Sequence, residues 1–186
     1  MRAAIVLAAG SSRRWGAENK LMARIGGRPL VCHAVAAARQ APVGRILVVT
    51  GRQSGRVAAA VRGPRVTVVR ARDHATGLSA SVRAGLAALR PCETSVFIFL
   101  GDMPRVPPFL AERLARALRI RDSGVRPTSR GVPGHPVLLR RPDRTELAQL
   151  HGDRGLAPLL RGLRTIPGPR SAIIDIDRRT DRAKLR

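Results

Sequence analysis

The first 20 residues bring together residue types that bind a phosphate chain. A short apolar run, residues 3–7, is followed by a loop of alanine, glycine and serine and then by three cationic residues. Small residues let the backbone approach a bound group and turn its N–H groups toward it. Arginine binds phosphate through two parallel hydrogen bonds, and lysine acts as a mobile point charge. The pattern predicts a triphosphate-binding loop made of Leu7, Ala8, Ala9, Gly10, Ser11, Ser12, Arg13, Arg14 and Lys20.

This loop does not have the spacing of the two common nucleotide-binding fingerprints. A Walker A loop ends in glycine, lysine and serine or threonine, and a dinucleotide loop has three glycines at fixed offsets. A signal peptide also has a basic residue before an apolar stretch, but here the stretch is short and two arginines follow it closely. A basic surface turn stays open as the alternative to a phosphate site.

Serines lie at the start of a predicted helix after Gly77. Ser79 and Ser81 fall in its first turn. Helix N-termini present free N–H groups and a partial positive charge, so serines there either cap the helix or bind an anionic ligand. Both interpretations stay open on the residues alone.

Three aspartates are candidate metal ligands. Asp102 follows residues 95–100, the most apolar stretch, where open α/β sheets bind their ligands. Magnesium prefers carboxylate and phosphate oxygens, so Asp102 is predicted to bind it; the alternative is a cap for the helix that begins near Pro107. Asp175 and Asp177 alternate with isoleucine and therefore share one face of a predicted strand. One of these two acids is a candidate second metal ligand. An exposed strand face, on which polar residues alternate with buried ones, explains them equally well.

His135 lies in a glycine- and proline-rich loop before a predicted short strand, residues 137–139. A single histidine is usually a structural hydrogen-bond partner. A functional contact is the alternative.

Apolar stretches separated by helical patterns predict an α/β fold. Strands that alternate with helices imply a parallel sheet with crossover helices on both faces. Strands are predicted at residues 3–7, 45–50, 66–69, 95–100, 137–139 and 172–177. Helices are predicted at residues 30–40, 53–61, 109–120, 145–150 and 156–163 and after Gly77, and residues 119–130 are interpreted as a basic connection.

The composition predicts one soluble domain, residues 1–186, because this length suits one substantial core and not two. No apolar run approaches the roughly 20 residues needed to span a membrane.

The net charge of +23 is typical of nucleic-acid binding, but the arginines are scattered and aromatic residues for base stacking are rare. We therefore expect no nucleic-acid partner, and read the charge as favouring anionic substrates. Cys32 and Cys92 lack metal-like spacing and indicate a reducing cytoplasm.

Four motifs together resemble the MobA-like NTP transferase family, which modifies the molybdenum cofactor. Residues 7–16 with Lys20 resemble its signature loop, and Ala9 makes the loop more similar to the cytidylyltransferase branch than to the guanylyltransferase branch. Gly-Leu-Ser-x-Ser at 77–81 is similar to a stretch that lines the nucleotide pocket. Gly-Asp-Met-Pro at 101–104 resembles the metal-binding motif, and Gly-His-Pro at 134–136 resembles the acceptor-side loop.

The resemblance implies a three-layer α/β/α, Rossmann-like, mostly parallel sheet of the nucleotide-diphospho-sugar transferase type. It implies an enzyme that uses CTP and Mg²⁺ to transfer CMP to the phosphate of molybdenum-molybdopterin, releasing pyrophosphate, with a molybdenum hydroxylase as client. Arg13, Lys20 and Asp102 are then the expected catalytic residues. The residues expected to bind the nucleotide are 7–12 with Arg14, and Gly77, Ser79 and Ser81; those expected at the acceptor are Gly134, His135 and Pro136.

The chain departs from the family pattern after Asp177. Relatives usually continue with Thr-Pro-Glu-Asp, whereas this chain has Arg-Arg-Thr-Asp at 178–181. Of the two acids, Asp175 is favoured as the second metal ligand. Two other functions stay open: the same transfer from GTP or another NTP to a sugar phosphate or other small phosphate, and a non-catalytic chaperone that binds the cofactor.

Overall fold

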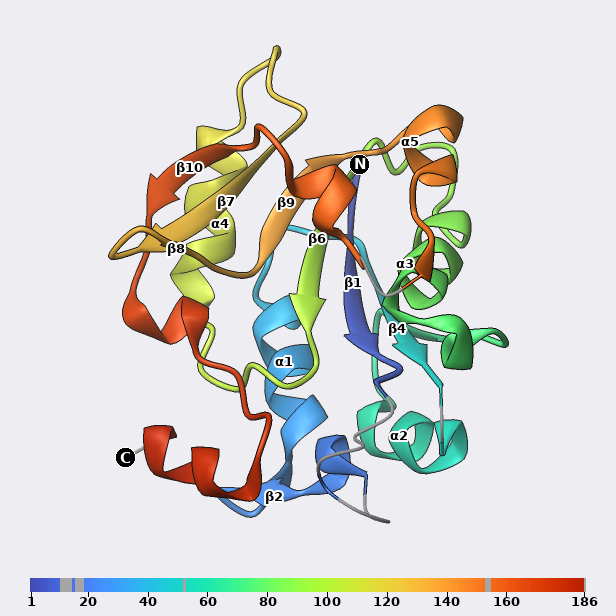
Figure 1. The fold of residues 1–186 in the computed structure, drawn as a ribbon, viewed down its shortest axis with the longest axis vertical. Helices are drawn as coiled ribbons and strands as arrows, with labels where there is room; N and C mark the ends of the chain where they lie inside the picture. The colour runs from blue at the N-terminus through green and yellow to red at the C-terminus, as the bar shows by residue number, and fades with distance from the viewer. Residues whose placement is uncertain (11–14, 16–18, 52, 153–154, 186) are drawn as a thin grey trace.

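A central β-sheet with helices on both faces organises the molecule (Figure 1). The computed structural model describes residues 1–10, 15, 19–51, 53–152 and 155–185. Within them the strands of this sheet are β1 (Arg2–Ala8), β4 (Arg45–Thr50), β5 (Val66–Arg70), β6 (Ser95–Leu100), β7 (Gly124–Ser129), β8 (Val132–Pro133), β9 (Val137–Arg140) and β10 (Arg164–Pro167). The helices are α1 (Leu30–Arg39), α2 (Ser54–Val61), α3 (Leu78–Ala87), α4 (Pro108–Ala117) and α5 (Arg144–Ala148). Strands β2 (Arg24–Ile25) and β3 (Arg28–Pro29) form a separate pair.

The strand order is β10-β7-β9-β6-β1-β4-β5, with β8 paired to β7. Strands β6, β1, β4 and β5 are parallel neighbours, so their carboxyl ends meet at one edge, the lower edge in Figure 1. Strand β9 is antiparallel to β6 and β7, and β10 is parallel to β7. The edge at which the parallel strands end is therefore the place where the loops after β1 and β6 come together.

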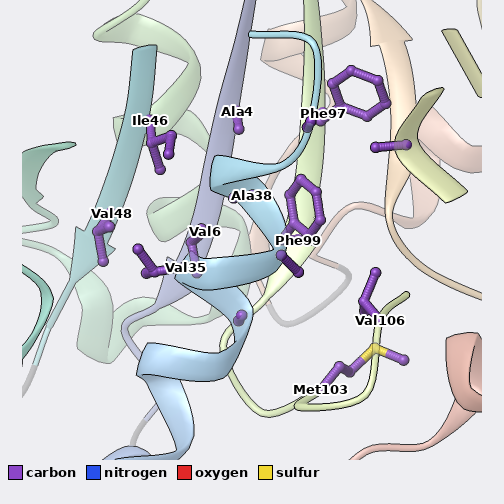
Figure 2. Close-up of a cluster of buried hydrophobic side chains, with 14 of the residues drawn as sticks. Ala4, Val6, Val35, Ala38, Ile46, Val48, Phe97, Phe99, Met103 and Val106 are labelled. Carbon is purple, nitrogen blue, oxygen red and sulfur yellow. The ribbon is translucent and has the colours of Figure 1, made fainter. Parts of the chain in front are cut away.

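Side chains of β1 point alternately into two hydrophobic clusters, one on each face of the sheet. Ala4 and Val6 pack with α1 and with Phe97 and Phe99 of β6 (Figure 2). Ile5 belongs to the other cluster, which includes buried residues of α3. Both faces are covered, and β1 is apolar from Ala3 to Ala8, as is typical of a parallel strand between two helical layers. The expected three-layer, mostly parallel α/β architecture is confirmed.

Most predicted elements are confirmed, and β6 begins and ends at the predicted residues. Three predictions between β6 and the C-terminus are wrong because tertiary contacts decide the structure there. The basic connection at 119–130 contains β7, in which Arg126 and Pro127 interrupt any apolar pattern but which pairs with β9 on one side and β10 on the other. The helix expected at 156–163 is a 3-10 helix at Ala157–Leu160, and β10 follows it.

The strand expected at residues 172–177 is also wrong. A 3-10 helix, Arg170–Ile173, occupies its first part. The following segment does not join the sheet; instead Ile176 donates its N–H to the carbonyl oxygen of Asp102 at 3.0 Å. This segment is therefore held by the loop after β6 and not by pairing with another strand.

In the described residues, no helix is both long and apolar enough to cross a membrane.

A buried ion pair joins the amino end of β4 to the loop before β6. Arg45 binds Glu93 with both ends of its guanidinium, at 2.9 and 2.7 Å, and also donates to the carbonyl oxygen of Ala88. Glu93 is 3% exposed and accepts a further hydrogen bond from the N–H of Arg90. The hydrogen bonds from Arg45 lower the pKa of Glu93, although burial acts in the opposite direction.

Replacing Glu93 by Gln is expected to lower the free energy of unfolding by about 3 kcal/mol at pH 7, because it leaves the largely buried side chain of Arg45, 14% exposed, without its counter-ion. Urea unfolding measures the effect. Glu112→Gln, which breaks an exposed pair with Arg116, is the control and should change stability by less than about 0.5 kcal/mol. Because the pKa of Glu93 is lower in the folded protein than in the unfolded chain, the ion pair stabilises the fold fully only above the unfolded pKa of about 4.5. The difference in free energy of unfolding between wild type and Glu93→Gln should therefore shrink as the pH falls below that value. Equal stabilities of wild type and Glu93→Gln at pH 7 would contradict this role.

Candidate functional site

Lys20 lies at the start of a 3-10 helix, Lys20–Met22, in the loop after β1. Asn19 caps this helix, because its side-chain oxygen accepts a hydrogen bond from the N–H of Leu21 at 3.0 Å. Leu21 packs into the cluster beside α1. These two contacts fix the backbone at Lys20, whose side chain is only 11% exposed.

Lys20 joins two carboxylates that are far apart in sequence. Its ammonium lies 2.8 Å from Oδ2 of Asp102 and 3.4 Å from Oδ1 of Asp177. Burial alone would lower the pKa of Lys20, but the charges and hydrogen bonds of Asp102 and Asp177 outweigh burial and raise it. The ammonium therefore stays charged at neutral pH, between two carboxylates.

Gly101 brings the end of β6 against the end of β1. Its N–H donates to the carbonyl oxygen of Leu7 at 2.9 Å, and a Cβ at this position would lie 2.9 Å from the same oxygen. A residue with a side chain would push the two loops apart. The glycine before Asp102 therefore allows that aspartate to reach Lys20.

The C-terminal segment is held in place by contacts to both loops. The indole N–H of Trp15 donates to the carbonyl oxygen of Asp177 at 2.9 Å, and Ile176 packs with Trp15. Asp181 accepts a hydrogen bond from the N–H of Asp177 at 2.9 Å. Residues 178–181 depart from the family pattern, but their last residue, Asp181, still holds Asp177 in place.

The structure brings Asp177, and not Asp175, into contact with Lys20. Asp175 is exposed. The sequence pattern predicted both acids on one face of a strand. Because that strand does not form, Asp177 faces Lys20 while Asp175 lies exposed. The assignment of Asp175 as a metal ligand stays a prediction that no contact supports.

The proposed phosphate loop is described only in part. Leu7, Ala8 and Ala9 are buried at the end of β1, and Gly10 is exposed. A Cβ at Gly10 would meet no atom of the described residues within 4 Å. Four predicted ligands lie outside the described residues: Ser11, Ser12, Arg13 and Arg14.

The predicted serines at the start of α3 are buried. Gly77 precedes the helix with φ of 123°, a conformation that favours glycine, and among the described residues no side chain caps the helix start. The hydroxyl of Ser79 lies 3.2 Å from the carbonyl oxygen of His151 and 3.3 Å from that of Gly155. Ser79 thus ties α3 to the turn before Leu156, while Ser81, also buried, lies in the same helical turn.

His135 lies beside the carboxyl end of β6. Its backbone N–H donates to the carbonyl oxygen of Ala172 at 2.8 Å, and Nδ1 of its imidazole lies 3.4 Å from the carbonyl oxygen of Ile98. Gly134 allows this packing, because a Cβ there would lie 2.4 Å from the same Ala172 oxygen. Burial lowers the pKa of His135 to about 4; the nearby charge of Arg126 adds to this, and Ile98 and Asp102 oppose it. The imidazole is therefore neutral at pH 7.

The neutral state of His135 predicts a loss of stability in acid. The unfolded chain binds the proton near pH 6.5 and the folded protein only near pH 4, so folding stability decreases by up to about 3 kcal/mol as the pH falls through this window. Replacing His135 by Gln should remove that part of the pH dependence. Urea unfolding of both proteins between pH 7.5 and 4.5 measures it. Parallel curves for the two proteins would show that His135 does not contribute.

The cluster has the donor chemistry of a divalent-cation site. Two carboxylate oxygens reach one cationic atom, and hard cations such as Mg²⁺ and Mn²⁺ prefer oxygen ligands. The described residues contain no group of three or more histidines, cysteines, aspartates or glutamates that could hold a metal ion. An ion at Asp102 and Asp177 would therefore complete its shell with water and with oxygens of the substrate.

Two residues that build the site were missed in the sequence. Asn19 carries a usable signal, since asparagine is a common cap residue and stands directly before Lys20. Trp15 carries none, because its partner, the carbonyl oxygen of Asp177, is 162 residues away.

Several known proteins are similar to this chain. Rv0371c from Mycobacterium tuberculosis H37Rv is 28% identical, with a TM-score of 0.85 over 98% of this chain and 96% of that one. A complex of the same protein with manganese gives a TM-score of 0.79 at 26% identity, over the same shares of the two chains. The molybdopterin-guanine dinucleotide biosynthesis protein A from Archaeoglobus fulgidus has a TM-score of 0.71 at 18% identity, over 98% of this chain and 95% of that one; this likeness shows the fold alone.

The bifunctional protein GlmU from Rhizorhabdus wittichii is 34% identical over 124 residues, which make up 66% of this chain and 27% of GlmU. This chain thus spans about a quarter of the length of the curated relatives it matches.

The family model of the MobA-like NTP transferase domain matches residues 4–167, which run from β1 to the end of β10. This match and the structural neighbours confirm both the resemblance found in the motifs and the expected fold class. The chain belongs to the MobA-like NTP transferase domain family.

Proposed function

We propose that this chain is a divalent-metal-dependent nucleotidyltransferase that transfers CMP from CTP to the phosphate of molybdenum-molybdopterin. The observation that carries the proposal is the contact of Lys20 with Asp102 and Asp177 at the carboxyl edge of the parallel strands. Open α/β sheets bind ligands at this edge. Membership of a family of NTP transferases supports the class of reaction.

In this reaction an oxygen of the acceptor phosphate attacks the α-phosphorus of the nucleotide. The bond from that phosphorus to the bridging oxygen breaks, and pyrophosphate leaves. Because both reactants are anions, the main barrier is electrostatic, and positioning together with fixed positive charge lowers it. The attacking phosphate is already ionised, so no general base is required.

Asp102 and Asp177 are the residues that would hold the cation, which we expect to be Mg²⁺. When bound, such an ion supplies positive charge to the phosphate oxygens. Lys20 remains protonated and presents its charge beside these carboxylates, where it would bind the departing pyrophosphate. We assign Arg13 to the same task, and Asp175 is the alternative second ligand.

The choice of CTP rests on Ala9, and the choice of acceptor rests on the Gly-His-Pro loop with its buried, neutral His135. The start of α3, with Gly77, Ser79 and Ser81, would contact the nucleotide. The client would be a molybdenum hydroxylase that uses the dinucleotide cofactor in the cytoplasm.

Pyrophosphate release tests the proposal. Purified protein with Mg²⁺ is offered CTP, GTP, ATP and UTP, each with molybdenum-molybdopterin, N-acetylglucosamine 1-phosphate or 2-C-methylerythritol 4-phosphate. We expect release with CTP and molybdenum-molybdopterin and, at most, weak release with the other pairs. Pyrophosphate release with another pair would overturn the proposed substrates but support the proposed class of reaction. Binding of the cofactor without any release would favour a chaperone.

A second acceptor class is favoured by one comparison. The bifunctional protein GlmU is 34% identical over 66% of this chain, whereas the likeness to the molybdopterin-guanine dinucleotide biosynthesis protein shows the fold alone. A nucleotidyltransferase with another NTP and a different small phosphate, such as a sugar phosphate, is therefore the second candidate, and the same panel separates the two.

A further inference from the structure

Arg126 lies in the middle of β7, on the face of the sheet that also carries α3. Its neighbour Val125 pairs with Leu138 of β9, and both belong to the cluster beneath α4. Side chains alternate along a strand, so Arg126 points to the opposite face. Val137 of β9 packs on that face together with residues of α3.

The side chain of Arg126 is partly buried. Its Nε is inaccessible to solvent and has no hydrogen-bond partner among the described residues. Burial lowers the pKa of Arg126, and no carboxylate of the described residues offsets this effect. A desolvated donor that lacks an acceptor destabilises the folded protein, and a desolvated positive charge does so more strongly. An arginine of this kind is suited to bind an anion that comes from outside the chain.

The strand register places Arg126 on the acceptor side of the site: its neighbour Val125 pairs with Leu138, so Arg126 lies beside the start of β9, which begins two residues after His135. The two residues are close enough for the charge of Arg126 to lower the pKa of His135, and Asp102 is close enough to raise it. If Nδ1 of the neutral imidazole donates to the carbonyl oxygen of Ile98, Nε2 is left as a hydrogen-bond acceptor. The acceptor side thus offers a forked donor for a phosphate beside an acceptor for a hydroxyl or amine hydrogen.

We propose that Arg126 binds the phosphate group of the acceptor substrate through its guanidinium, so that the acceptor is a phosphate monoester with a hydroxyl or N–H group near the phosphate. This inference rests on the proposed function, because it assigns the second substrate of that reaction. Arg126 would be a binding and specificity residue that fixes the attacking phosphate beside Asp102 and takes no proton.

The test compares Arg126→Met with wild type and with Arg130→Met, which removes an exposed arginine from the same hairpin. Loss of a charge-assisted pair is expected to raise the acceptor KM about 10- to 100-fold, with the NTP KM unchanged. The Tm of Arg126→Met should equal or exceed that of wild type, because an unsatisfied buried donor is removed. Arg126→Lys should recover part of the acceptor affinity, and Arg130→Met should behave like wild type.

A structural role gives the opposite result. If Arg126→Met lowers the Tm and leaves the acceptor KM unchanged, or raises both KM values together, the inference is wrong. If wild type releases no pyrophosphate from any pair of substrates, the proposed function fails by itself. Calorimetric binding of inorganic phosphate then decides: binding at least 10-fold weaker in Arg126→Met than in Arg130→Met supports the anion site, and equal binding overturns it.

Discussion

Replacing Asp102 by Asn should lower turnover by at least about 100-fold while the protein stays folded, because the reaction would lose a carboxylate that holds the cation at the reacting phosphates. The side chain changes by one atom. The carbonyl oxygen of Asp102, which accepts the N–H of Ile176, is untouched, so the C-terminal segment keeps its contact. Pyrophosphate release under saturating substrates, together with a thermal melt, measures both quantities.

Asp143→Asn is the matched control for this variant. Asp143 caps α5 by accepting the N–H of Glu146 at 2.8 Å, and asparagine caps helices about as well as aspartate. The same chemical change should therefore leave turnover and stability near those of wild type. If Asp102→Asn also keeps nearly full turnover, the carboxylate does not serve the reaction and the proposed site is wrong.

Replacing Lys20 by Met should also reduce turnover by about two orders of magnitude or more, because it removes the buried positive charge that would stabilise the departing pyrophosphate. Methionine is close to lysine in length and lacks the charge. The cap by Asn19 and the packing of Leu21 do not involve the ammonium, so the 3-10 helix should persist. Pyrophosphate release again gives the measurement.

Lys20→Met has a second expected result that separates charge from folding. Without metal, Asp102 and Asp177 lose the ammonium that both contact, so the Tm should fall. The ammonium of wild type also competes with a cation for the same oxygens, so adding MnCl2 should raise the Tm of Lys20→Met by several degrees more than that of wild type. Equal shifts in both proteins would mean that the metal does not bind at these two carboxylates.

Much of the fold could be predicted from local sequence. The strands that became β1, β4 and β6 are continuous apolar runs bounded by glycine or loop residues, and burial on both faces leaves such runs few other structures. Strands β7 and β10 could not be predicted in this way. Arg126, Pro127 and Pro167 break their pattern, and only pairing with neighbours across the sheet makes them strands.

The site divides along the same line. Residue types and spacing in single segments were enough to name Lys20 and Asp102 and the family whose motifs surround them. They were not enough to choose between Asp175 and Asp177, because both acids have the same local surroundings in the chain. The choice of Asp177 comes from Trp15, which binds its carbonyl oxygen, and from Asp102, whose own carbonyl oxygen holds the residue before it.

The amino-acid sequence by itself thus determined the layers of the sheet, the start of the site in the loop after β1 and the class of chemistry. Periodicity and loop composition are local properties, so they can be seen in one segment at a time. Tertiary structure alone decided which second acid meets Lys20 and where Arg126 lies with an unpaired Nε. The first feature depends on a contact between residues 157 apart in the sequence. The second depends on pairing across the sheet and on how far burial removes a charge from water, which no single stretch of the chain encodes.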